Sequence, residues 1–113
     1  MNEEIVKVLK AMRVKLAAGW TQHSAARRAD GTHVLSSDPK ACSFCLMGAL
    51  WHMNVYSSSL EQCVEAEITQ TLRDQGLTVG LVTYNDAPGR TQAEILALVD
   101  KTIERLEKTN EQE

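Results

Sequence analysis

The stretch from Pro39 to Asn54, PKACSFCLMGALWHMN, most constrains how this chain can fold, because it is apolar almost throughout. Large apolar side chains fall on every side of a helix drawn through it, which is typical of a helix buried on most faces. It is shorter than the ~18 residues that a membrane span requires. Asp38 suits the N-cap and Pro39 the first helical position. We therefore predict a core helix over residues 39–54 of a soluble domain.

Three other segments repeat apolar residues at helical spacing, as Ile5, Leu9, Met12 and Leu16 do. They predict helices over about 2–18, 59–75 and 92–108, and Gly76 is the predicted stop of the second of these. Asp30-Gly31 is a turn signal that predicts a small β-hairpin in the first long connection. Residues 77–84 fit either an extended segment or a short helix, and the tail after about 108 is expected to fray. The predicted fold is all-α: one globular domain over residues 1–113, a compact bundle of about four helices.

Charge is unevenly distributed along the 113 residues. The formal net charge is −3, which argues weakly against binding to nucleic acid. There are seven basic and four acidic residues before residue 41, and five basic and eleven acidic residues from residue 41 onward. One interpretation is that these charged residues simply lie on solvated helix faces. The other is a basic N-terminal surface that steers an acidic protein partner, formed by Lys7, Lys10, Arg13, Arg27 and Arg28.

The chain has three cysteines, an odd number, and begins without a signal peptide, so a reducing cytoplasm is the expected compartment. Cys42-x-x-Cys45 resembles a metal or redox motif. On a continuous helix, however, His52 would lie roughly 10 Å along the axis from Cys45, too far to share one ion. We therefore predict no metal and no cofactor. Nucleophilic catalysis could use Cys45 or Cys63 with His23 or His52, but nothing in the sequence pairs them.

Three blocks of sequence resemble a known family. They are GW-x-Q with the ADG turn that follows (residues 19–31), FCLMGAL (44–50) and YNDAPGRTQAEILALVDKTI (84–103). Together they are similar to a small group of phage and bacterial proteins classed as a domain of unknown function. That family usually has tryptophan at the positions of Phe44 and Tyr84, so an aromatic ring is kept. The resemblance implies a phage or prophage origin, hence the cytoplasm of a bacterial host, and it implies no activity.

The loop NDAPGRT, residues 85–91, is the candidate site. Its simpler interpretation is a turn followed by a helix that Thr91 caps, with Glu94 completing a capping box. Arg90 is not explained by the cap, because a cation beside a helix N-terminus opposes the helix dipole. It could join free backbone N–H groups in an anion site, or pair with Asp86. The candidate ligand-binding residues are Asn85, Asp86, Arg90, Thr91, Trp20 and Gln22.

The sequence thus favours a non-enzymatic protein-interaction module that binds a host or phage partner, away from membranes and nucleic acid. A small anionic-ligand binder centred on NDAPGRT is the alternative, and a small enzyme is the third hypothesis. The identity of the partner or ligand and the oligomeric state stay open.

Overall fold

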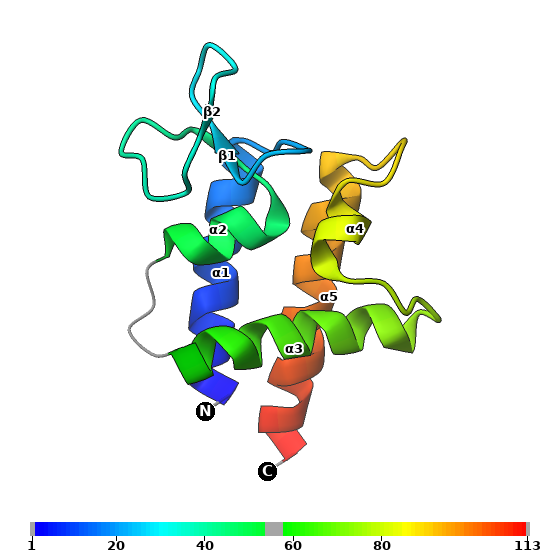
Figure 1. Ribbon diagram of the computed structural model, residues 1–113. Helices are drawn as coiled ribbons and strands as arrows, with labels where there is room; N and C mark the ends of the chain where they lie inside the picture. The colour runs from blue at the N-terminus through cyan, green and yellow to red at the C-terminus, as the bar shows by residue number, and fades with distance from the viewer. Residues whose placement is uncertain (1, 54–57, 113) are drawn as a thin grey trace.

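A computed structural model describes residues 2–53 and 58–112. Helices α1 (Asn2–Ala18) and α5 (Gln92–Gln112) run antiparallel within it (Figure 1). No helix among the described residues is both long and apolar enough to cross a membrane. The helices and strands of the described part of the chain are α1 Asn2–Ala18, β1 Ala26–Arg27, β2 His33–Val34, β3 Ser43–Phe44, α2 Leu46–His52, α3 Ser58–Asp74, α4 Leu81–Asn85 and α5 Gln92–Gln112.

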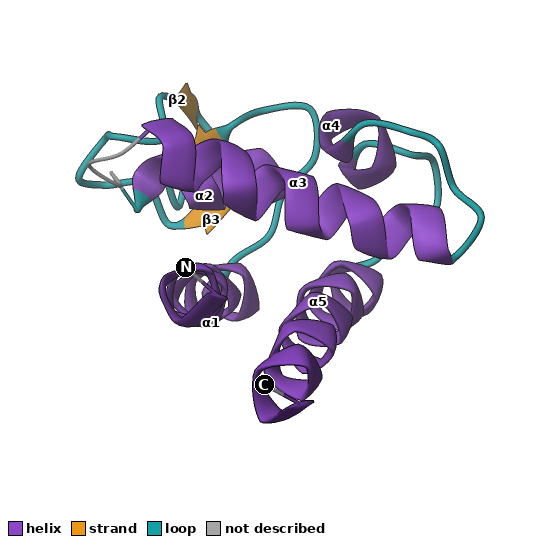
Figure 2. Cartoon of the chain, turned by 90° about the horizontal axis from the view of Figure 1, so that it is seen from below, coloured by secondary structure: helices purple, strands orange, loops and turns teal. Residues whose placement is uncertain are grey.

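The elements form two layers. Figure 2 shows α1 and α5 side by side in one layer, with α2, α3, α4 and the strands in the other. The strands pair antiparallel in the order β2-β1-β3, so that Ala26 lies opposite Val34 on one side and Phe44 on the other. The hairpin predicted around Asp30-Gly31 is therefore confirmed, and a third strand that the sequence did not predict joins it. The fold is mostly helical with a small sheet.

The core lies between the two layers and is mostly aliphatic. A buried hydrogen bond of 2.7 Å between the hydroxyl groups of Thr71 and Thr102 also joins α3 to α5. The apolar periodicity of the sequence correctly identified the inner faces of the long helices. Their largest fully buried apolar side chains are Leu9, Met12, Leu16, Val64, Ile68, Leu72, Ile95, Leu98 and Val99.

The prediction of a helix from residue 39 was wrong at its start, because α2 begins only at Leu46. The preceding backbone pairs with β1 instead, as the bond from the Cys42 N–H to the Arg27 carbonyl shows (2.9 Å). The N-cap is Cys45, whose sulfur accepts a hydrogen bond from the Gly48 N–H (3.2 Å). Residue 54, the predicted end of the helix, lies outside the described residues.

Asp38 was predicted to cap this helix, and that prediction was wrong as well. Its carboxylate accepts a hydrogen bond from the Lys40 N–H (2.7 Å), within the loop that leads to β3. The side chain therefore stabilises a turn several residues before the helix begins.

Gly48 explains how closely α2 approaches the strands. A Cβ added at this position would overlap the carbonyl oxygen of Ala25, so a larger residue would push the two backbones apart. The absence of a side chain at Gly48 therefore allows α2 to pack closely against the chain that enters β1.

The other predicted boundaries agree with the structure to within a few residues. Helix α3 ends before Gly76, which has a positive φ of 83° and acts as the predicted stop. Residues 77–84, which the sequence left undecided, divide into a non-helical segment and the start of the short helix α4. Helix α5 continues to Gln112, so the backbone beyond residue 108 is helical where fraying was expected.

Candidate functional site

Four of the six candidate residues meet at Asn85, at the end of α4. Asn85 has no exposed surface, and both ends of its amide are satisfied. Its Oδ1 accepts from the Trp20 Nε1–H (2.8 Å) and from the Leu46 N–H (3.0 Å). Its Nδ2 donates to the Thr21 carbonyl (3.1 Å) and to Asp86 Oδ1 (2.9 Å). One side chain therefore ties α4 to the loop after α1 and to the first residue of α2.

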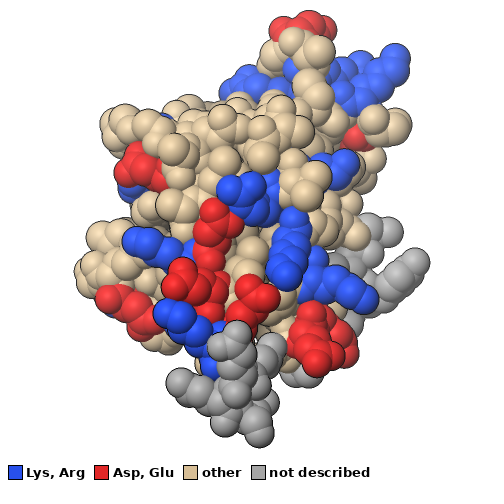
Figure 3. All heavy atoms as spheres, turned by 180° about the vertical axis from the view of Figure 1, so that it is seen from behind, with Lys and Arg blue, Asp and Glu red and all other residues tan. Residues whose placement is uncertain are grey.

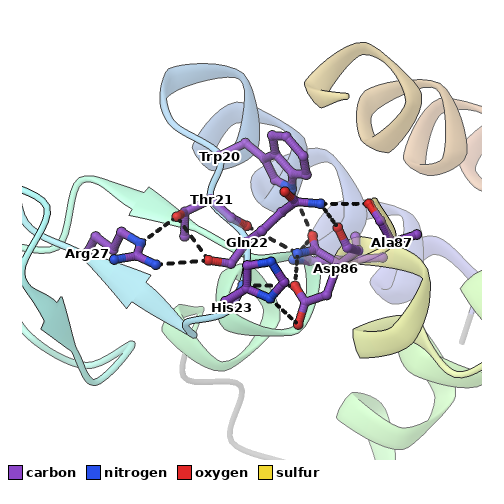
Figure 4. A network of polar contacts seen from close by, with 9 residues as sticks. Trp20, Thr21, Gln22, His23, Arg27, Asp86 and Ala87 are labelled. Atoms are coloured by element: carbon purple, nitrogen blue, oxygen red, sulfur yellow. Dashed lines mark hydrogen bonds and ion pairs between the residues drawn. The ribbon is translucent and has the colours of Figure 1, made fainter. Parts of the chain in front are cut away.

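Gln22 and Asp86 extend this contact in both directions between the two loops (Figure 4). Gln22 Nε2 donates to the carbonyl oxygens of Asn85 (2.9 Å) and Ala87 (3.0 Å). Asp86 Oδ1 accepts from the His23 N–H (3.0 Å), and Asp86 Oδ2 lies 3.8 Å from His23 Nδ1. We call the bonded segments 20–23 and 85–87 the Asn85 network.

Two features of the Asn85 network carry an energetic cost that its hydrogen bonds offset. His23 has a positive φ of 64°, a backbone conformation that non-glycine residues seldom adopt. Burial alone would raise the pKa of Asp86. The hydrogen bonds from the His23 N–H and the Asn85 amide outweigh that effect, so the pKa of Asp86 lies below its ordinary value. The carboxylate is therefore held in its charged form.

Arg27 supports the same loop, a role that the sequence reasoning missed. Its guanidinium donates to Thr21 Oγ1 (2.7 Å) and to the carbonyl oxygens of Gln22 (3.1 Å) and Gly31 (3.0 Å). An arginine four residues before the glycine of a tight turn could have suggested such a contact, but only the fold brings the carbonyl groups to it. Arg27 was expected on a surface that steers a partner. In the structure its guanidinium instead donates hydrogen bonds to the backbone and a hydroxyl group of its own loop.

Arg90 and Thr91 lie outside the Asn85 network. Thr91 caps α5: the Glu94 N–H donates to Thr91 Oγ1 (3.2 Å), and Glu94 Oε1 accepts from the Thr91 N–H (3.0 Å). The predicted capping box is therefore confirmed. The hydrogen bond from the Thr91 N–H holds the pKa of Glu94 below its ordinary value.

Arg90 is bound to the protein on several sides. Its Nε donates to the Tyr84 carbonyl (2.9 Å), its Nη1 donates to Glu94 Oε2 (3.0 Å), and its guanidinium carbon lies 3.7 Å from the centre of the Tyr84 ring. The pairing with Asp86 that the sequence suggested was wrong, because Asp86 faces His23 instead. Glu94 thus occupies the place beside Arg90 and the first N–H groups where an anion would sit. Ligand binding by the six candidate residues stays a prediction.

Phosphate tests the anion hypothesis directly. We expect phosphate to change the melting temperature of the wild type and of Arg90→Ala by the same amount, because an anion would first have to displace the Glu94 carboxylate. Thermal shift across a phosphate series is the measurement, with chloride at matched ionic strength as the control. A stabilisation seen in the wild type and lost in Arg90→Ala would instead establish an anion site at this loop.

A groove lies next to the Asn85 network, between α2 and α4. Two adjoining hollows form it, with volumes of about 340 and 430 Å³. Trp51 and Val82 line both hollows and are 45% and 51% exposed, respectively. Glu65 lines the first hollow and Asp86 the second. We call this surface the Trp51–Val82 groove; sequence reasoning missed it, because Trp51 was counted as a core residue of an all-round buried helix.

The thiol groups form no catalytic arrangement with the histidines in the described part of the chain. Cys45, His23 and Asp86 line the same hollow, but no hydrogen bond joins Cys45 to His23. Burial raises the pKa of the Cys45 thiol, which disfavours the thiolate that a nucleophile needs. His52 Nδ1 lies 2.7 Å from the carbonyl oxygen of Ser36.

Metal ligands are likewise not gathered in the described residues. All three cysteines are free thiols. Within residues 2–53 and 58–112, no group of three or more His, Cys, Asp or Glu side chains is placed to hold a metal ion.

A further hollow of about 510 Å³ runs along α5 and is lined by Lys101, Glu104, Arg105 and Lys108. Its cations are largely neutralised: Arg105 lies 2.9 Å from a carboxylate oxygen of Glu67, and Lys108 lies 3.1 Å from Glu104. This mixture of charges does not build an anion site.

The chain is related to known proteins through a family model. No curated protein and no solved structure matches it. The family model covers residues 1–105, which include the Asn85 network and the Trp51–Val82 groove. The chain therefore belongs to a family of unknown function, DUF6197.

Proposed function

We propose that this protein is a non-enzymatic protein-interaction module and that its contact surface is the Trp51–Val82 groove. The observation that carries the proposal is the exposure of two large apolar side chains across one hollowed surface. Partly exposed tryptophan is characteristic of interfaces, where it supplies a large share of the binding energy. A phage or host protein is the partner we expect, given the phage or prophage origin that the resemblance implies.

The state of the polar candidates supports an interaction surface over a ligand site. Trp20, Gln22 and Asn85 donate or accept hydrogen bonds within the Asn85 network. A polar ligand there would have to break bonds that join two parts of the fold. The Trp51–Val82 groove has no such requirement, because its apolar walls already face solvent.

The basic N-terminal region gives weaker support for binding an acidic partner. Arg13 forms a two-pronged ion pair with Asp100 on α5, at 2.6 and 3.1 Å, and Lys10 lies 3.5 Å from Glu107. Figure 3 shows the face of the molecule opposite to that of Figure 1, where basic and acidic groups lie beside one another. Two of the five basic residues of this region are thus paired with acidic residues of α5, which reduces the positive field available for steering.

Affinity capture with matched variants tests the proposal. Wild-type protein, Trp51→Ala and Leu35→Ala would each be used as bait in bacterial lysate, with bound proteins quantified by mass spectrometry. Leu35 is the control, because it is 76% exposed and lies in a loop away from the groove. We expect at least one protein to be retained by the wild type and Leu35→Ala and to fall about 30-fold or more with Trp51→Ala, the effect of losing an interface hot spot.

Two readouts keep this experiment decisive. Circular dichroism and melting temperature should show that Trp51→Ala stays folded, since its side chain is about half exposed. If Trp51→Ala retained the same proteins as the wild type, the Trp51–Val82 groove would not be the contact surface.

A further inference from the structure

The carboxylates around the Trp51–Val82 groove give it a negative charge. Glu65 and Asp86 line its two hollows, and no lysine or arginine of the described chain lines either one. Glu65 is exposed on α3, and its carboxylate has no ion-pair partner among the described residues. An occupant that brings a positive charge therefore meets a carboxylate that is not yet neutralised.

Asp86 contributes differently at the other end of the groove. Its position is fixed by the bonds from the His23 N–H and the Asn85 amide, so its carboxylate is held in place before any partner arrives. The His23 ring lies 3.8 Å away and lines the same hollow. A fixed carboxylate loses little conformational freedom when it pairs, which favours binding.

The middle of the groove is apolar. Trp51 and Val82 form its walls, and the buried residues Met47 and Leu81 line the first hollow beside them. An apolar surface between two carboxylates disfavours both anionic occupants and wholly polar ones. Nucleic acid and anionic metabolites would meet repulsion at both ends, and a wholly polar segment would leave the apolar walls uncovered.

We propose that the Trp51–Val82 groove binds a short segment of a partner protein in which a large apolar side chain is flanked by lysine or arginine. The apolar side chain lies between Trp51 and Val82, and the basic side chains pair with Glu65 and Asp86. This inference rests on the proposed function and adds the chemistry of the partner. It also reverses the sign of the expectation from the sequence, which was an acidic partner for a basic surface.

Synthetic peptides test this chemistry without knowledge of the partner. The probe peptide carries a central leucine flanked by lysines, and two matched peptides replace the lysines with glutamates or the leucine with serine. Binding would be followed by anisotropy of a fluorophore on the peptide. We expect the leucine-lysine peptide to bind roughly tenfold more tightly than either matched peptide, the effect of two partly exposed ion pairs or one apolar anchor.

Charge reversal on the protein gives the sharper result. Glu65→Lys should weaken binding of the leucine-lysine peptide and strengthen binding of the leucine-glutamate peptide. Glu4→Lys, which changes the net charge equally at an exposed position at the start of α1, should change neither by a comparable factor. Equal effects of Glu65→Lys and Glu4→Lys would overturn the proposal, because the charge of the whole molecule and not of the groove would then decide binding.

The outcomes separate this inference from the proposed function. If a captured protein depends on Trp51 but is bound equally by wild type and Glu65→Lys, the groove is an interface and the basic partner is wrong. Absence of binding by every peptide overturns the inference in the same way. If sedimentation instead shows a dimer that Trp51→Ala dissociates, the occupant is a second copy of the chain, and the proposed basic segment is wrong.

Discussion

Replacing Leu50 with alanine is expected to lower the free energy of unfolding by about 2–5 kcal/mol, the usual cost of emptying a well-packed core position. Leu50 has no exposed surface, and it lies on α2, which contacts α1, α4 and β3. Several elements would have to move to fill the cavity, so relaxation recovers little of the loss. Urea denaturation of the wild type and Leu50→Ala measures it, with an unchanged m-value showing that the unfolding transition is the same.

Leu35→Ala is the control for this change, because it removes the same atoms from a side chain that is 76% exposed. Its effect should stay within about 0.5 kcal/mol, as for most surface substitutions. If Leu50→Ala cost no more than Leu35→Ala, α2 would not be part of the core, and the exposed Trp51 would have to be reinterpreted as one side of a wholly exposed helix.

Replacing Asn85 with alanine is expected to cost about 3 kcal/mol, because a buried donor that loses its partner costs about 1–3 kcal/mol. The change removes four hydrogen bonds, and it leaves the Trp20 Nε1–H and the Leu46 N–H without their acceptor. Water admitted by the shorter side chain recovers part of the loss. Urea denaturation measures the change in stability. The environment of Trp20 changes as well. The tryptophan fluorescence of the folded variant, at urea concentrations below the unfolding transition, should therefore differ from that of the folded wild type.

A double-mutant cycle isolates the hydrogen bond from the loss of packing. Trp20→Phe removes the indole donor and keeps a ring. The combined loss of Trp20→Phe and Asn85→Ala should therefore be smaller than the sum of the single losses by roughly 0.5–3 kcal/mol. Gln62→Ala, at an exposed amide on α3, serves as a control for removal of an amide side chain. Additive losses of Trp20 and Asn85 would show that the bond between them contributes nothing to stability.

Much of the fold follows from local patterns in the sequence. Apolar residues at helical spacing identified the inner faces of α1, α3 and α5. Asp30-Gly31 predicted the hairpin, and Gly76 predicted the end of α3. Thr91 with Glu94 predicted the start of α5. Each of these signals lies within a few neighbouring residues, so it can be recognised without knowing where the rest of the chain lies.

The start of α2 shows where local patterns fail. Residues 39–45 have the composition of a buried helix and a suitable cap at Asp38. The backbone at residues 42–45 nevertheless bonds to the chain around β1, and the helix begins after Cys45. A strand pairing that involves residues many positions away stabilises an extended conformation against a helical preference worth less than about 1 kcal/mol per residue. Apolar composition alone cannot distinguish the two, because a short apolar run fits a buried helix and a buried strand alike.

Short-range signals in the chain were thus enough to define the long helices, their buried faces and the residues worth inspecting, but the roles of those residues came from the packing. Trp20 and Asn85 lie 65 positions apart, and their bond makes them part of the scaffold. The apolar context of Trp51 predicted a core residue, yet Trp51 faces solvent with Val82 across one groove. Burial and hydrogen bonding depend on which distant segments meet, and that is a property of the packed chain, which no short stretch of residues contains.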